Sequence, residues 1–313
     1  MNDVALMEIF SHLADLDPHG ERFDRVIRRT YDQLYDGQRT GRYRWEQLFK
    51  TEKTHFGTLI EINTQREFQF LDGGALDYLI QGHEVDCKYS QSPGGWMFPP
   101  EAVNQLCIVI TSSDKLATFS VGVVRAAAHL LNPGRNRDSK ATLSEEGRAG
   151  IRWLHRAGNL TPNLLLRISD DDRHAIMDEL AGPRRGQRRV DELFRRIQGA
   201  LITRTVVATV AQQDDYMKRV RGNGGARTRL RPEGIVILGD YESHRAVARA
   251  LGLPCPRGGS FVSVQLAGTR AGEAGSVLLQ GRHWRVADET DRTEVAPLLP
   301  DTRRQFLDDV PAA

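Results

Sequence analysis

A short run of alternating residues carries the side chains of greatest chemical interest. From His83 onward polar and apolar residues take turns, which is typical of a β-strand with one face on a core. On this pattern Asp86 and Lys88 share one face, while Val85 and Cys87 turn to the core. A carboxylate can hold a divalent cation through its oxygens, and a neighbouring lysine can position or help to deprotonate a water molecule beside that cation.

Two more carboxylates precede this strand. Asp77 lies at the start of the run Leu76 to Ile80, which we predict to be a partner strand, joined to the first by the tight connection of residues 81–83. This hairpin would bring Asp77 and Asp86 together at one end of a sheet, with Glu61 leaning over the same point from a preceding helix. Such a set suits phosphodiester hydrolysis, because two carboxylates hold Mg²⁺ and a lysine can offset charge on the phosphorane.

The spacing of these residues by itself leaves other interpretations open. An isolated Asp-X-Lys is more often an exposed, salt-bridging strand edge than a catalytic pair, so the upstream carboxylates matter. Glu67 and Glu84 are competing carboxylates. Glu84 shares the face of Asp86 but lies one strand repeat further from the expected end of the sheet, and Glu67 lies near a turn. The residues that we expect to be catalytic are Glu61, Asp77, Asp86 and Lys88.

The elements expected around these residues form an α/β domain with a mixed sheet, residues 1–154. Apolar spacing predicts helices at residues 3–16, 21–34, 43–56, 125–131 and 151–154. Runs rich in Val, Ile and Phe predict buried strands at residues 106–111 and 117–124. The break AGNLTPN predicts a linker at residues 155–162, which leaves residues 163–313 as a second domain.

The second domain is expected to be mainly α and to contain a winged-helix DNA-binding motif. A helix at residues 203–211, the turn of residues 212–213 and a helix at residues 215–220, capped by Asp214, follow in the order of a helix-turn-helix. The Gly-rich run of residues 222–238 then has the composition of a flexible basic hairpin, the wing of such a domain. A plain helical bundle is the alternative.

Charge is unevenly spread along the chain, although the formal net charge is only +2. Residues 184–231 hold 13 basic and four acidic groups, a net of +9, whereas residues 1–160 hold 19 basic and 21 acidic groups. A field so concentrated predicts a phosphate-binding surface, with a solvated helix face as the alternative. The residues that we assign to DNA are Arg204, Lys218, Arg219, Arg221, Arg227, Arg229 and Arg231.

The sequence also excludes several classes of protein. The N-terminus has no basic start followed by an apolar run, and no stretch approaches the apolar length of a membrane span. Cys87, Cys107 and Cys255 are too few and too scattered for a disulfide framework or a zinc site. We therefore expect a cytoplasmic protein without a membrane partner.

Several motifs resemble one family of nucleases. The spacing Asp77…Asp86-Cys87-Lys88 resembles the PD-(D/E)XK nuclease motif, with Leu76 where that motif has proline. More narrowly, the chain resembles the NaeI family of restriction endonucleases in four runs, TYDQLYDGQRTGR, LIEINTQREF, LDYLIQG and EVDCKYS. These motifs are long and collinear, and with the basic second half they cover most of the chain.

The resemblance implies a specific activity and site. It implies that Glu61, Asp77, Asp86 and Lys88 are the active-site residues, with Mg²⁺ as the cofactor and Asp77, Asp86 and Cys87 as the metal positions. It further implies a homodimeric enzyme of a restriction-modification system that cuts double-stranded DNA at the palindrome GCCGGC. The C-terminal domain, similar to the winged-helix part of the bacterial catabolite activator protein, would bind a second DNA copy as an effector, the type IIE arrangement.

A second resemblance fails on one residue. The run from Leu34 to Arg39 resembles the Lys-x-Asp-Gly-x-Arg motif of DNA ligases, but a leucine takes the place of the lysine. Without that amine no adenylyl-lysine can form, and we expect no nucleotide cofactor. A turn at Asp36-Gly37 beside arginines accounts for the run better.

Two other functions share part of this pattern. A winged-helix transcription regulator with a non-catalytic N-terminal dimerisation domain would bind DNA specifically, and that binding would survive Asp86→Ala. A nicking repair nuclease would share the chemistry but act as a monomer on one strand. The regulator leaves the carboxylates and Lys88 without a role, so the restriction endonuclease is the preferred hypothesis.

Overall fold

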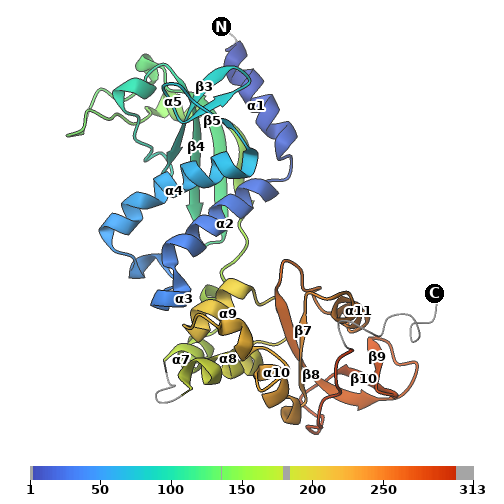
Figure 1. Cartoon of the computed structure of the whole chain (residues 1–313). Helices are drawn as coiled ribbons and strands as arrows, with labels where there is room; N and C mark the ends of the chain where they lie inside the picture. Colours follow the sequence, from blue (N-terminus) through green and yellow to red (C-terminus); the bar gives the residue numbers. More distant parts are fainter. Residues whose placement is uncertain (1–2, 135, 179–183, 301–313) are drawn as a thin grey trace. The chain divides into compact units, whose positions relative to one another are not determined.

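The computed structural model describes residues 3–134, 136–178 and 184–300, and its chain divides into two compact units. Unit 1 consists of Met1–Tyr35 and Tyr43–Leu166, and unit 2 of Asp36–Arg42 and Arg167–Ala313. Figure 1 colours unit 1 blue to green and unit 2 yellow to red, except that the blue helix α3 (Gly37–Thr40) belongs to unit 2. Residues 301–313 of the predicted second domain lie outside the described residues.

Unit 1 is built on a six-stranded sheet with the order β1-β2-β3-β4-β5-β6. β3 and β4 are parallel, and the other neighbouring strands are antiparallel. The predicted mixed α/β architecture is thus confirmed for this unit. Its strands are β1 (Leu71–Asp72), β2 (Tyr78–Ile80), β3 (His83–Tyr89), β4 (Leu106–Ser113), β5 (Thr118–Arg125) and β6 (Arg152–Asn159).

Three helices cover one face of this sheet (Figure 1), and they are α1 (Val4–Leu16), α2 (Glu21–Tyr35) and α4 (Lys50–Phe68). Each helix turns an apolar stripe inward, so that Ile9, Ile27 and Ile60 are fully buried. Alternate residues of β4, among them Leu106 and Ile108, point toward the helices and complete this core.

The opposite face of the sheet is buried as well, which explains why β4 is apolar at successive positions. Cys107 and Val109 point to this side and pack in a second core, beneath the segments that follow β3 and β5. Trp96 is the largest fully buried side chain there, and its indole Nε1 donates to the carbonyl of Ile110 at 2.8 Å. Short elements complete this layer, namely η2 (Pro100–Ala102), η3 (Ala128–Leu130) and α5 (Glu145–Ala149).

The helix predicted at residues 151–154 is wrong. Residues 152–159 form β6, so most of the predicted linker at residues 155–162 belongs to the sheet of unit 1. Gly122 of β5 explains the pairing, because a Cβ atom there would lie 2.5 Å from Ile151 and 3.0 Å from Trp153. The missing side chain lets β6 pack closely against β5, and this tertiary pairing outweighs the local helical spacing.

Two other helices predicted for unit 1 have different bounds from those expected. Residues 125–131 contain only the 3-10 turn η3, because β5 extends through Arg125. The helix predicted at residues 43–56 begins at Lys50, after the 3-10 turn η1 (Trp45–Gln47). The helices predicted at residues 3–16 and 21–34 are confirmed as α1 and α2.

Unit 2 combines short helices with a four-stranded antiparallel sheet of order β7-β8-β10-β9, so it contains more β-structure than we expected of a mainly α domain. The strands are β7 (Ile235–Gly239), β8 (Phe261–Thr269), β9 (Ser276–Leu279) and β10 (Arg282–Val286). α6 (Leu164–Arg167) lies at the division between the units. The helices of unit 2 after it are α7 (Asp170–Met177), α8 (Arg185–Arg196), α9 (Arg204–Ala211), α10 (Ala226–Arg229) and α11 (Glu242–Ala250). Among the described helices of both units, none is long and apolar enough to cross a membrane.

The predicted helix-turn-helix is only partly present. Its first helix is confirmed as α9, capped by the side chain of Thr203, which accepts from the N–H of Val206. The helix predicted at residues 215–220 is instead a 3-10 segment, η4 (Tyr216–Arg219). Its cap position is Asp215 rather than Asp214, and the Asp215 side chain makes no capping hydrogen bond.

The basic hairpin predicted at residues 222–238 is also wrong. The run forms α10 and the 3-10 turn η5 (Arg231–Glu233) before β7 begins, and β7 pairs with β8. Ala226 and Leu230 are both fully buried. Their spacing of four residues places them on one helical face, so the burial of apolar side chains decides the conformation here despite the preceding glycines.

Phe56 offers a test of how α4 is held to the sheet. Its buried ring lies 4.7 Å from the ring of Tyr31 on α2 and 4.5 Å from that of Tyr89 on β3. We expect Phe56→Ala to lower the free energy of unfolding of unit 1 by about 3–5 kcal/mol, because it leaves a cavity between three elements. Hydrogen exchange of the slowest β4 amides measures this change.

Phe49→Ala is the matched control, because the Phe49 side chain is 71% exposed. It should change the same free energy by less than about 1 kcal/mol. Equal losses in the two variants would show that Phe56 does not hold α4 to β3.

Candidate active site

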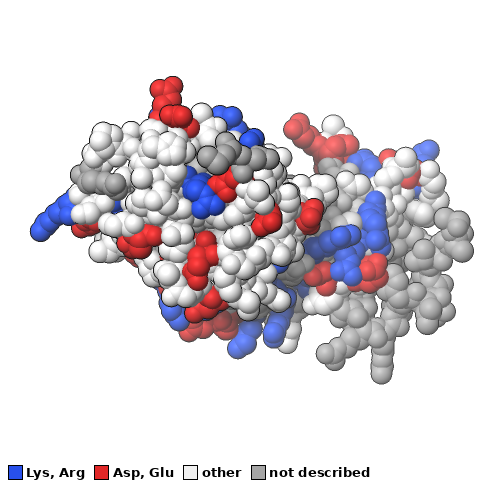
Figure 2. Space-filling model, turned by 90° about the horizontal axis from the view of Figure 1, so that it is seen from above, with Lys and Arg blue, Asp and Glu red and all other residues white. Residues whose placement is uncertain are grey.

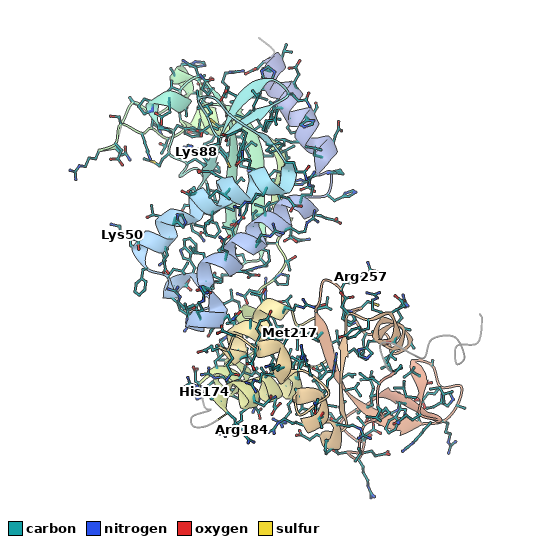
Figure 3. All side chains as sticks on the ribbon, in the orientation of Figure 1. Lys50, Lys88, His174, Arg184, Met217 and Arg257 are labelled. Atoms are coloured by element: carbon teal, nitrogen blue, oxygen red, sulfur yellow. The ribbon has the colours of Figure 1, made fainter. Side chains whose placement is uncertain are left out.

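β3 carries two of the predicted catalytic residues on one face, as its alternation indicated. Nζ of Lys88 donates to Oδ1 of Asp86 at 2.5 Å. Asp86 is 4% exposed, and Val85 and Cys87, which point to the helix-covered core, are fully buried. Figure 3 shows Lys88 at the sheet, on the strand that packs against α4.

Asp77 joins this pair from a loop rather than from a strand. The strand predicted from Leu76 begins at Tyr78, and the part of β3 with which it pairs is limited to residues 83–85. Cys87 lies beyond this ladder, and its N–H donates to Oδ2 of Asp77 at 2.7 Å. The same oxygen lies 3.9 Å from Nζ of Lys88. A carboxylate therefore occupies the position where a strand partner would otherwise pair with β3.

Glu61 approaches the same point from α4. The hydroxyl of Tyr78 donates to the backbone carbonyl of Glu61 at 2.8 Å, which joins α4 to the strand that follows Asp77. Burial raises the pKa of the Glu61 carboxyl, the charge of Asp77 raises it further, and Lys88 opposes both effects. The Glu61 carboxyl thus lies within electrostatic reach of Asp77 and Lys88.

The charges at this point do not balance. Burial raises the pKa of Asp86 to about 7, Lys88 opposes this rise, and Asp77 adds to it. Burial alone would lower the pKa of Lys88, but Asp86 and Asp77 hold it above its ordinary value, so Lys88 remains an ammonium. Two adjacent carboxylates repel each other, and a divalent cation between them would relieve that repulsion.

The available oxygens fit a hard cation such as Mg²⁺. Asp77 and Asp86 supply carboxylates, and the Cys87 carbonyl accepts from Nζ of Lys88 at 3.2 Å. Burial raises the pKa of the Cys87 thiol well above its ordinary value, so Cys87 could contribute only its carbonyl. Across the described ranges no three His, Cys, Asp or Glu side chains form a metal-binding group. Mg²⁺ suits such a sparse set, because it usually retains several water ligands.

The two competing carboxylates have other partners. Glu67 accepts from Nε and Nη2 of Arg25 on α2, at 3.1 and 2.8 Å. Glu84 accepts hydrogen bonds from the backbone N–H groups of residues 74–76. These contacts agree with the expectation that neither carboxylate is a catalytic group. The contact between Glu84 and the loop was not predicted; the pair Gly73-Gly74 before Asp77 is the signal that could have indicated it.

Charged side chains are exposed on both units, and the residues assigned to DNA differ in their exposure. On the face of unit 1 that stands in front in Figure 2, acidic and basic side chains are interspersed. In unit 2, four of the seven residues assigned to DNA are exposed, namely Arg204, Lys218, Arg221 and Arg229. Lys218 belongs to η4, whose Met217 is labelled in Figure 3, and its side chain is 65% exposed.

Four of the assigned residues, the exposed Arg229 among them, make contacts that hold unit 2 together. Arg219 donates to the side chains of Gln213 and Asp215, and Arg229 pairs with the buried Asp191 at 2.6 Å. Arg227 and Arg231 each donate from Nε to a backbone carbonyl. Burial also lowers the pKa of the Arg227 guanidinium. A sequence shows that these residues are basic but not that their charges are already engaged.

Comparison with known proteins matches both units. A family model described as "Restriction endonuclease NaeI" matches residues 7–295. The chain is also 50% identical, over 303 residues, to a protein of Lentzea aerocolonigenes named "Type II restriction enzyme NaeI", and the match covers 95% of each chain.

Proposed function

Since this chain belongs to the NaeI family of restriction endonucleases, we propose that it cuts both strands of DNA at a palindromic site with Mg²⁺ as cofactor. That it is a type II restriction endonuclease follows from the family itself. The proposal adds the site, the palindrome GCCGGC, the active-site residues Glu61, Asp77, Asp86 and Lys88, and stimulation by a second bound copy of the DNA.

The convergence of Asp77, Asp86 and Lys88 carries this proposal. Asp77 and Asp86, with the Cys87 carbonyl, would hold Mg²⁺. When bound, the ion would polarise the scissile phosphate and lower the pKa of a coordinated water molecule. Lys88, which the carboxylates keep charged, would orient the attacking water and offset the negative charge that grows on the phosphate. Glu61 adds a third negative charge, which favours a divalent over a monovalent cation.

The proposed role of unit 2 is to bind the effector DNA through a winged-helix arrangement. Support comes from α8, α9 and η4 in succession, followed by the antiparallel pair β7 and β8. Ile202, between α8 and α9, bridges to Phe261 at the start of β8, where winged-helix domains have a short strand. Arg204, Lys218 and Arg221 are three of the exposed cations of this region. A homodimer is proposed because two-fold symmetric protomers match a palindrome.

A DNA-binding regulator with a non-catalytic first unit is not favoured. It would leave the buried Asp86, its ion pair with Lys88 and the contact between Asp77 and Cys87 without a purpose. A nuclease that cuts one strand shares this chemistry, so the products of cleavage must separate it from the restriction enzyme.

The central experiment is cleavage of plasmids that carry one or several GCCGGC sites, with and without Mg²⁺. We expect double-strand breaks at these sites and none in EDTA. Asp86→Asn and Lys88→Met should each reduce the rate at least about 100-fold, because each removes a charge that acts on the transition state. Sequencing the product ends identifies the site and the position of the cut.

Glu67→Gln provides the control for this experiment, because Glu67 pairs with Arg25 away from the site. It should cut at the parental rate. Full activity of Asp86→Asn, or nicks in one strand alone, would contradict the proposed mechanism.

A second experiment addresses the effector site. The triple variant Arg204→Gln, Lys218→Gln, Arg221→Gln should lose stimulation of a one-site plasmid by added GCCGGC duplex. Effector affinity should also depend less steeply on salt, by about one unit of log–log slope per charge removed, because fewer counterions are displaced.

A matched triple variant of exposed arginines elsewhere in unit 2 controls for net charge, namely Arg257→Gln, Arg270→Gln, Arg292→Gln. Stimulation should survive in this variant. Equal loss in both triples would place the effector surface somewhere other than α9, η4 and the residues after it.

A further inference from the structure

Glu84 reaches back across the hairpin to the loop that carries Asp77. It lies on β3, opposite Leu79 of β2 in the strand register. Its Oε1 accepts from the N–H of Gly74 at 2.7 Å, and its Oε2 accepts from those of Ala75 and Leu76 at 3.2 and 2.9 Å. Three successive N–H groups thus surround one carboxylate, which is an arrangement that binds anions.

The three N–H donors around Glu84 favour the ionised form of its carboxyl group. Backbone hydrogen bonds lower the pKa of its carboxyl, with that from Leu76 as the largest cause. Hydrogen bonds to a charged acceptor are stronger and more directional than neutral ones. The loop therefore closes on a carboxylate that stays charged at neutral pH.

The two glycines before Asp77 allow this close approach. A Cβ atom on Gly73 would lie 2.2 Å from the carbonyl oxygen of Leu76 and 2.8 Å from Oε2 of Glu84. A Cβ atom on Gly74 would lie 3.2 Å from Oε1 of the same residue. A side chain at Gly73 is therefore incompatible with the folded loop unless backbone atoms move.

Asp77 follows directly after the three residues whose N–H groups donate to Glu84. Leu76, whose N–H is held by Glu84, is followed by Asp77, whose Oδ2 accepts from the N–H of Cys87. Glu84 and Cys87 both belong to β3, so this one strand holds the loop through hydrogen bonds at two places, residues 74–76 and Asp77. The position of the Asp77 carboxylate beside Lys88 depends on both sets of hydrogen bonds.

We propose that Glu84 is a positioning residue for DNA cleavage, which fixes the loop of residues 73–77 so that Asp77 reaches the active site. This inference rests on the proposed function and adds a residue to it. Glu84 acts through the backbone of the loop, so its removal should displace Asp77 without removing a reacting group. A displacement of about 1 Å at a catalytic group can reduce a rate by about 100-fold.

The test compares Glu84→Ala, Glu84→Gln and Glu84→Asp with the parent enzyme. In Glu84→Ala, we expect kcat to fall by about 10- to 100-fold while KM for DNA stays within about two-fold. Glu84→Gln should be nearly as slow, because an amide presents one acceptor and an NH₂ group to three donors. Glu84→Asp should recover part of the rate, since its shorter side chain keeps the charge.

Hydrogen exchange followed by mass spectrometry provides a readout that needs neither metal nor cleavage. In Glu84→Ala, amides of residues 74–76 should exchange at least about ten-fold faster, and the Cys87 amide should also lose protection. The amides of β4 should keep theirs. Gly73→Ala should produce the same exchange pattern and the same loss of kcat with Glu84 intact, because the added Cβ opens the same loop.

Glu67→Ala is the control, as an ion-paired carboxylate of α4 outside the loop. The inference is overturned if Glu84→Ala cuts at the parental rate, if it exchanges like the parent at residues 74–76, or if its defect lies in KM, which would mean that Glu84 contacts DNA. If the parent enzyme itself fails to cut, the proposed function fails, while the exchange data still decide whether Glu84 holds the loop.

Discussion

The hydrogen bond from the Cys87 N–H to the Asp77 carboxylate is the contact on which the candidate active site depends. It exists because β2 is short and its pairing with β3 is limited to the first residues of that strand, which leaves the remainder of β3 open on that side. Asp77 fills the opening and so meets Asp86 and Lys88. Extending β2 by one or two residues would occupy the Cys87 N–H and turn the Asp77 carboxylate away.

The surrounding fold offsets part of the free-energy cost of burying a carboxylate at this site. Asp86 is buried beside Cys107 of β4, and burial of a lone carboxylate is strongly unfavourable. The Lys88 ammonium offsets part of that cost, and β3 and β4 are held rigidly between cores on both faces of the sheet. A site that is short of positive charge and yet rigid is prepared to accept a divalent cation without rearranging.

Much of the active site could be predicted from the sequence because strand alternation is a local property. It placed Asp86 and Lys88 on one face and Cys87 on the other, and the short 81–83 connection located Asp77. The errors arose where distant contacts decide the structure. β6 forms because Gly122 admits it, α10 because Ala226 and Leu230 reach the core, and Arg227 and Arg229 are engaged by partners far along the chain. The role of Glu84 likewise depends on a loop ten residues earlier.

The proposed mechanism requires Asp77, Asp86 and the Cys87 carbonyl to form one cation site beside Lys88. Crystals of the protein soaked in Mn²⁺, a substitute for Mg²⁺ with a measurable anomalous signal, test it most directly. We expect an anomalous peak next to both carboxylates and the Cys87 carbonyl in the parent protein, and no such peak in Asp77→Asn. A peak bound elsewhere in unit 1, or the same peak in Asp77→Asn, would contradict it.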